Sequence, residues 1–150
     1  MEASTTFAIS AFTAFPAVHD SITNIYSTIN NILTHRYANM IRIQMDELDV
    51  QFSIQSIECF IKGSSECVNS DVTELTVERI HETIRKIHKT LASIEKKLND
   101  YQTNWYVWLR GIHLSDEIQE LHQQKTILDK RVDMLTQILI MNAISKKKSH

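Results

Sequence analysis

The chain has 150 residues, of which 43% are hydrophobic and 23% charged, a balance that excludes wholesale disorder and allows one buried core. Its net charge is −2 and its bases are interspersed with acids, so we expect no nucleic-acid binding, which needs a broad basic surface. Only two Gly and one Pro are present, which favours long helices over many short strands.

Residues 1–16 form an apolar N-terminal segment without Lys or Arg, in which Phe7, Phe12 and Phe15 stand among small residues. The segment lacks the preceding positive charge that is typical of a secretion signal. Two interpretations remain open. The segment is either a short helix packed on the rest of the protein, or it leaves the bundle and enters a membrane or a neighbouring subunit.

Two helices are expected in the first half of the chain. Apolar residues from Val18 to Ile32 alternate in steps of four and three, which predicts a helix over 17–34. A second stripe that includes Ile41, Phe52 and Ile61 predicts a helix over 37–62. We expect a bend near 34–37, because a single helix of about 69 Å would be too long for this domain.

The strongest pattern lies in the second half. From Val77 to Ile112 the apolar residues keep the four-three alternation without a slip, which predicts a helix over 71–109 that can bend or break near 100–103. The phase changes after Gly111, and a last helix is expected over 115–143. Acidic residues early and basic residues late in both helices complement the helix dipole.

These four helices, joined by short loops, predict an all-α, up-and-down four-helix bundle. We expect a single domain over 1–150, with the apolar segment at 1–16 and a basic tail at 144–150. Replacing Lys97, expected at the surface, should cost far less stability than replacing Ile87 or Leu91. The residues expected among the most buried are Ile80, Ile84, Ile87, Leu91, Ile94 and Leu98.

No residue pattern predicts a catalytic or metal site. The Glu78-x-x-His81 half-motif of di-metal bundles has no second copy, so a solvated face is the better interpretation. Cys59 and Cys67 fit neither a disulfide framework nor a zinc pattern, and Cys59 is expected to be a small core residue in a reducing compartment. No phosphate loop or serine elbow occurs. We therefore expect no enzyme activity, cofactor or small-molecule substrate.

An aromatic band between residues 101 and 114 exceeds what core building requires. Trp105, Tyr106, Trp108 and the adjoining Leu109 are too widely spread to face a single seam. One interpretation is that Trp105 and Trp108 cap the bundle core. The other is a partner-binding patch, in which Trp, Tyr and Arg110 are suitable anchors.

The layout of the chain resembles the HeLo-type four-helix bundles found in MLKL-like pseudokinases and in fungal and animal cell-death receptors. The similar elements are the apolar stretch Phe7–Val18, the segment MDELDVQFSIQSIECFI, the helix IRKIHKTLASIEKKLNDYQ and the last helix EIQELHQQKTILDKRVDMLTQIL. The resemblance implies a signalling and execution module that oligomerises and attacks or docks on membranes.

Two functions therefore stay open. One is a non-enzymatic module that self-associates and acts on a membrane in a cell-death or immune-type response, with Lys146, Lys147 and Lys148 attracted to anionic lipid. The other is a passive scaffold or adaptor whose stripes pair with a partner helix or a second copy. We expect the protein to be cytoplasmic, with recruitment to a membrane under the first function.

Overall fold

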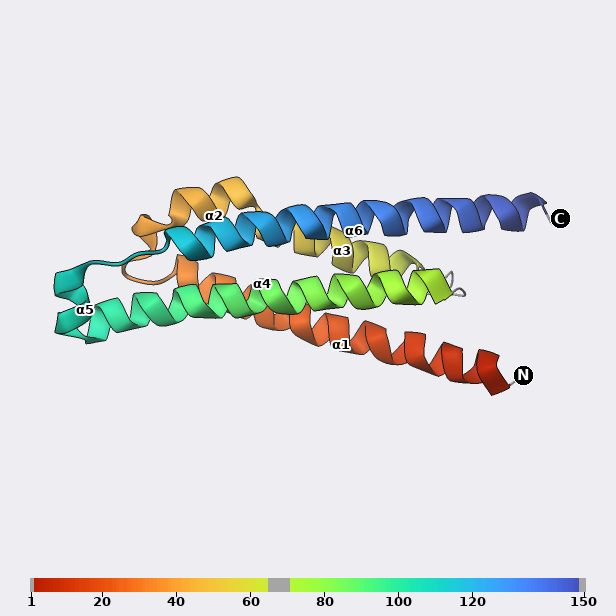
Figure 1. Ribbon diagram of the computed structural model, residues 1–150, viewed down its shortest axis with the longest axis horizontal. Helices are drawn as coiled ribbons and strands as arrows, with labels where there is room; N and C mark the ends of the chain where they lie inside the picture. Colours follow the sequence, from red (N-terminus) through yellow and green to blue (C-terminus); the bar gives the residue numbers. More distant parts are fainter. Residues whose placement is uncertain (1, 65–70, 149–150) are drawn as a thin grey trace.

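The computed structural model describes residues 2–64 and 71–148, and for residues 2–17, 60–64, 146 and 148 it describes the backbone alone. Most residues in these described ranges are helical, and none of them lies in a strand. The prediction of an all-α protein is therefore confirmed. The long helices lie along one axis, with the start of the first and the end of the last at the same end (Figure 1).

The first half holds α1 (Glu2–Leu33), the 3-10 helix η1 (Ala38–Met40), α2 (Arg42–Leu48) and α3 (Val50–Ser64). The bend expected near 34–37 is confirmed, since turn residues separate α1 from η1. The single helix predicted over 37–62 is wrong. Asp49 adopts a left-handed φ of 46°, which ends α2 and lets α3 begin in a new direction.

α1 is longer than the helix predicted over 17–34, because it begins at Glu2 and passes through Pro16. Proline has no amide hydrogen, so the α-helical backbone bond to the residue four positions earlier is missing there. The apolar N-terminal segment is therefore continuous with α1, but it joins the rest of the helix at a weakened point.

The second half holds α4 (Asp71–Thr103), α5 (Trp105–Arg110) and α6 (Ser115–Lys148). The break expected near 100–103 in the predicted helix over 71–109 occurs at Asn104, which separates α4 from α5. α6 begins at Ser115 as predicted and extends beyond the predicted end at 143.

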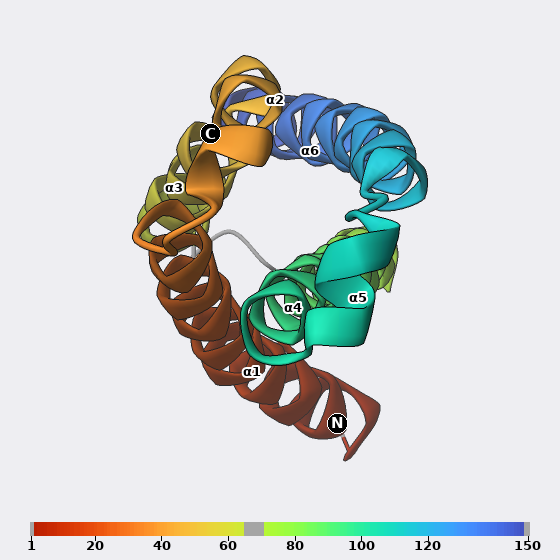
Figure 2. The same ribbon diagram turned by 90° about the vertical axis from the view of Figure 1, so that its left-hand side faces the viewer.

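The helices enclose one core in a ring. Viewed along the long axis, α1, the α2–α3 pair, α6 and α4 follow one another around the ring (Figure 2). α4 has the most extensive contacts, with α1 on one flank and α6 on the other. The predicted up-and-down arrangement of four helices is not confirmed, because two of those helices are divided and because consecutive α3 and α4 face each other across the ring.

The predicted stripe of α4 forms the centre of the core, and its members are fully buried, which confirms the expectation from the sequence: Ile80, Ile84, Ile87, Leu91, Ile94 and Leu98. Phe52, in contrast, is 64% exposed, which corrects its place in the second stripe. The break at Asp49 changes the phase of the helix, so that Val50 faces the core instead, together with Ile54 and Ile57 of the predicted stripe.

We expect Ile87→Ala and Leu91→Ala each to lower the free energy of unfolding by about 2 to 5 kcal/mol, because each deletion loses transfer energy and leaves a cavity. Urea unfolding followed by circular dichroism measures the change. Lys89→Ala, at an exposed position of the same helix, is the control and should change it by less than about 0.5 kcal/mol. Equal effects of core and control variants would contradict the observed packing.

Candidate interaction site

α5 is a separate two-turn helix at one end of the molecule, beyond the end of α4 (Figure 1). Asn104 has extended backbone angles and caps the helix, since its side-chain oxygen accepts a hydrogen bond of 3.0 Å from the Tyr106 amide. Gly111 follows the last turn with a φ of 81°. The cap and the glycine together turn the chain away from the α4 axis.

The aromatic side chains of α5 are exposed. Trp105 is 70% exposed and Leu109 64%, and Tyr106 and Trp108 are also open to solvent. The rings of Trp105 and Tyr106 meet edge to face at 5.4 Å, and the Arg110 guanidinium lies 4.8 Å from the centre of the Tyr106 ring. We call these five residues the aromatic patch.

The interpretation that Trp105 and Trp108 cap the core is therefore wrong. Tyr37 and Ile112 pack against the core instead, and the Tyr37 ring meets that of Tyr101 edge to face at 4.7 Å. Because Asn104 ends α4 one turn before Trp108, the tryptophans leave the seam that the sequence pattern assigned to them. Exposed Trp, Tyr and Arg side chains are the types that dominate binding energy at protein interfaces.

The other predicted site residues lie at the opposite end of the molecule, where α1 begins and α6 ends (Figure 1). Phe7, Phe12 and Phe15 are in α1, but their side chains lie outside the described part of the chain. Lys147 is exposed, whereas the side chains of Lys146 and Lys148 are likewise outside the described part. No helix within residues 2–64 and 71–148 is long and apolar enough to cross a membrane.

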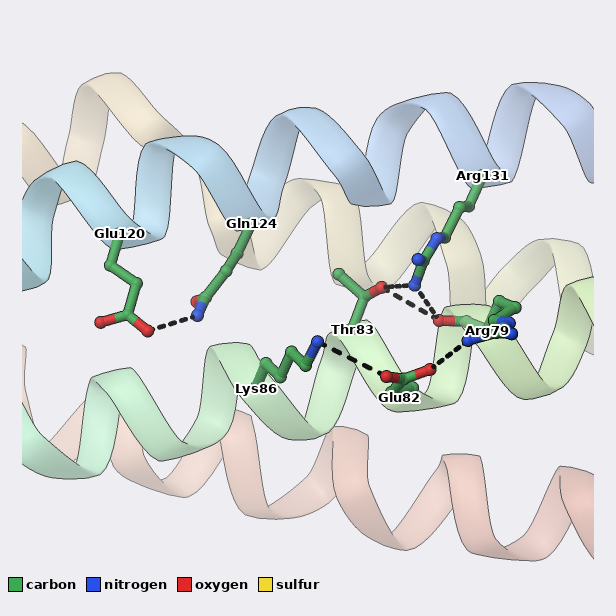
Figure 3. A network of polar contacts seen from close by, with 7 residues as sticks. All are labelled: Arg79, Glu82, Thr83, Lys86, Glu120, Gln124 and Arg131. Carbon is green, nitrogen blue, oxygen red and sulfur yellow. Dashed lines mark hydrogen bonds and ion pairs between the residues drawn. The ribbon is translucent and has the colours of Figure 1, made fainter.

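A row of polar contacts, which we call the polar ladder, joins α4 to α6. Arg131 donates to the Arg79 carbonyl at 2.7 Å and to the Thr83 hydroxyl (Figure 3). One step further, the buried Thr90 hydroxyl hydrogen-bonds to Gln124 at 3.1 Å. From one contact to the next, the residue number rises by seven in α4 and falls by seven in α6. The ladder therefore fixes an antiparallel register of the two helices.

The last step of the ladder is an ion pair between Lys97 and the buried Glu117. Lys97 also donates to the His113 carbonyl at 3.1 Å. The second carboxylate oxygen of Glu117 is buried and has no hydrogen-bond partner among the described residues. Lys97 is thus the charge that compensates a buried carboxylate, which corrects its expected role as a dispensable surface residue.

The sequence contained a signal for the ladder that apolar periodicity misses. Thr76, Thr83 and Thr90 recur every seven residues and are buried, as expected for a polar line beside an apolar seam. Gln124 and Arg131 have the same spacing in α6. Threonine is often buried when its hydroxyl bonds a carbonyl four residues earlier, which each of these three does.

The histidine and cysteine side chains considered for metal or redox chemistry do not form such a site in the described part of the chain. His81 is half-buried and its Nε2 lies 3.0 Å from the Ser21 hydroxyl, so it joins α4 to α1. Cys59 is exposed, which corrects its expected core position, and Cys67 lies outside the described residues. Within residues 2–64 and 71–148, no three His, Cys, Asp or Glu side chains are grouped as metal ligands.

Comparisons with known proteins found no match. No family model, no curated protein and no solved structure matches this chain.

We expect Lys97→Met to lower the free energy of unfolding by about 1 to 3 kcal/mol, because it leaves the buried Glu117 carboxylate without a donor. Lys96→Met, at the exposed neighbouring position, is the matched control. Chemical unfolding at neutral pH compares the two variants. An equal effect of both would show that the ion pair contributes nothing measurable.

A second expectation concerns pH. Burial, assisted by the charge of Arg85, lowers the pKa of His81 below its usual 6.5. The unfolded chain therefore binds a proton at a higher pH than the folded chain does, so this contribution to stability is complete above about pH 6.5 and is lost as the pH falls below it. His81→Gln should flatten the fall in melting temperature between about pH 6.5 and 5, whereas His122→Gln, at an exposed site, should preserve it.

Proposed function

We propose that the chain is a non-enzymatic helical-bundle module that self-associates through one end and acts on membranes with the other. The observation that carries this proposal is the placement of the two sets of residues. The aromatic patch lies at one end, and the start of α1 and the end of α6 both lie at the other end (Figure 1).

The distance between the two ends supports a division of roles. α6 has 34 residues and spans about 51 Å at 1.5 Å per residue. Copies that associate through their aromatic patches leave the opposite ends free. Each associated pair then carries two N-terminal segments, and a particle that binds lipid through both has a higher avidity than one segment.

The proline in α1 supports a membrane role for the N-terminal segment. The described side chains of α1, which begin at Val18, attach it to α4 and α3, for example through Ser21 with His81 and the Tyr26 hydroxyl with Glu58 at 3.2 Å. Burial and the Glu58 carboxylate raise the pKa of Tyr26 to about 12, so its hydroxyl remains a donor. Pro16 lies just before this attached part, at the point where one backbone hydrogen bond is missing.

The biological setting of the proposal comes from the HeLo-type resemblance, which implies a cell-death or immune-type response. Under this proposal the partners are further copies of the chain and an anionic membrane surface, and the protein is cytoplasmic until it is recruited. Lys146, Lys147 and Lys148, at the end of α6, supply the positive charge for that surface.

An adaptor is the second candidate function, and a specific observation favours it. Ile127, Met134 and Met141 are exposed and recur every seven residues along α6. Exposed apolar residues at this spacing form the kind of stripe on which a partner helix packs. The adaptor would use α6 and the aromatic patch without a membrane.

Changing Phe12 and Phe15 to Glu should abolish binding to liposomes at every salt concentration, because it removes apolar area from the inserting segment. Changing Lys146, Lys147 and Lys148 to Gln should weaken binding mainly at low salt, since each cation contributes about 1 kcal/mol near an anionic surface and salt screens it. Co-sedimentation with vesicles containing phosphatidylserine measures both effects.

Phe52→Glu is the matched control, because it makes the same chemical change at an exposed position of α3. If the N-terminal variants bind vesicles like the unchanged protein, the membrane function is wrong. If, in addition, Trp105→Ala and Trp108→Ala abolish partner capture without unfolding the chain, the adaptor is the correct function.

A further inference from the structure

α5 interrupts what is otherwise one apolar series. In sequence, the α4 stripe continues through Tyr101, Trp105, Trp108 and Ile112 with the same alternating steps of four and three. In the structure α4 ends at Thr103, and both tryptophans are exposed rather than packed in the core. The local sequence therefore favours a longer helix than the folded chain contains.

Two short interruptions allow the chain to turn back from α4 into α6. At Asn104 the backbone is extended, with φ −114° and ψ 107°. Gly111 has φ 81° and ψ 169°, a region that only glycine adopts without strain. Of residues 71–148, Gly111 alone has a positive φ. The hairpin of α4 and α6 thus depends on these two positions.

The polar ladder is arranged symmetrically about α5. For each of its three pairs, between residues 83 and 131, 90 and 124, and 97 and 117, the midpoint in sequence is residue 107. If two copies opened at α5 and paired antiparallel, every step of the ladder would re-form between them. Val107 would then lie on the two-fold axis, with Trp105 opposite Leu109 and Tyr106 opposite Trp108 of the second copy.

We infer that two copies of the chain associate by exchanging α6, with α5 as the hinge. This inference rests on the proposed self-association and specifies its structure. The contacts of α6 with α2, α3 and α4 are the same in both forms, so they do not decide between them. What the exchanged form adds is burial of the aromatic patch against its symmetry mate, which the monomer leaves in water.

The first test changes the hinge. Gly111→Ala places a side chain where φ is positive, which strains the hairpin but not an opened, helical hinge. We expect the dimer fraction to rise by roughly five-fold or more at equal concentration. Size-exclusion chromatography with light scattering measures it over a dilution series. Gly63→Ala, in α3, is the control and should leave the fraction unchanged.

The second test detects the exchange itself. Lys97→Glu places two carboxylates in the ladder, and Glu117→Lys places two ammonium groups there, so each variant alone should be destabilised. In an exchanged dimer that contains one copy of each variant, residue 97 in each α4 faces residue 117 in the α6 of the other copy. In both of these pairs the two residues carry opposite charges. Refolding the two together should yield a one-to-one heterodimer that melts several degrees above either variant.

The matched control is the pair Lys96→Glu and Asp116→Lys, which makes the same charge changes at exposed neighbouring positions. This mixture should show no preference for the heterodimer. If the unchanged protein dimerises but the ladder variants do not rescue each other, exchange is wrong and self-association stands. If the unchanged protein and Gly111→Ala are both monomeric at every concentration, self-association itself is wrong.

Discussion

The buried stripe of α4 is the contact on which the rest of the structure depends. Ile84 and Leu91 are fully buried, and burial of each such side chain contributes about 1.5 to 3 kcal/mol before the cost of ordering the chain. Apolar packing alone does not choose one register, because a helix that slips by a turn still buries similar area. The polar ladder on the flank makes that choice, since a slip would leave Thr90, Arg131 and Glu117 without their partners.

Sequence periodicity predicted the parts of the fold that a repeating pattern determines. The α4 stripe, the bend after α1 and the start of α6 all follow from apolar spacing and turn residues. The division at Asp49 could not be predicted, because a left-handed aspartate leaves no distinctive mark in one sequence. Whether Trp105 and Trp108 are exposed stayed open for a related reason. A single capping residue, Asn104, ends the helix while the apolar pattern continues.

The aromatic patch and the polar ladder differ in how much of each could be predicted from the sequence. The aromatic patch was recognised from residue types, but whether it caps the core or faces solvent depends on the direction of α5, which only the structure gives. The polar ladder was overlooked because buried threonines fall outside an apolar pattern. The polar ladder and the aromatic patch both belong to the hairpin α4–α5–α6. The ladder sets the register between α4 and α6, and the exposed patch lies in α5, which connects them.

The parallel packing of α1 on α4 has a consequence for the order of events during synthesis. Asn31 bonds to Glu95 and His35 to Asn99, each across 64 residues of sequence. The ribosome adds roughly 5 to 20 residues per second, so α1 waits about 3 to 14 seconds for the whole of α4 to follow it. During that time the apolar face of α1 has no helix of its own chain to cover it except α3. The apolar face of α1 is therefore open to other apolar surfaces during that interval.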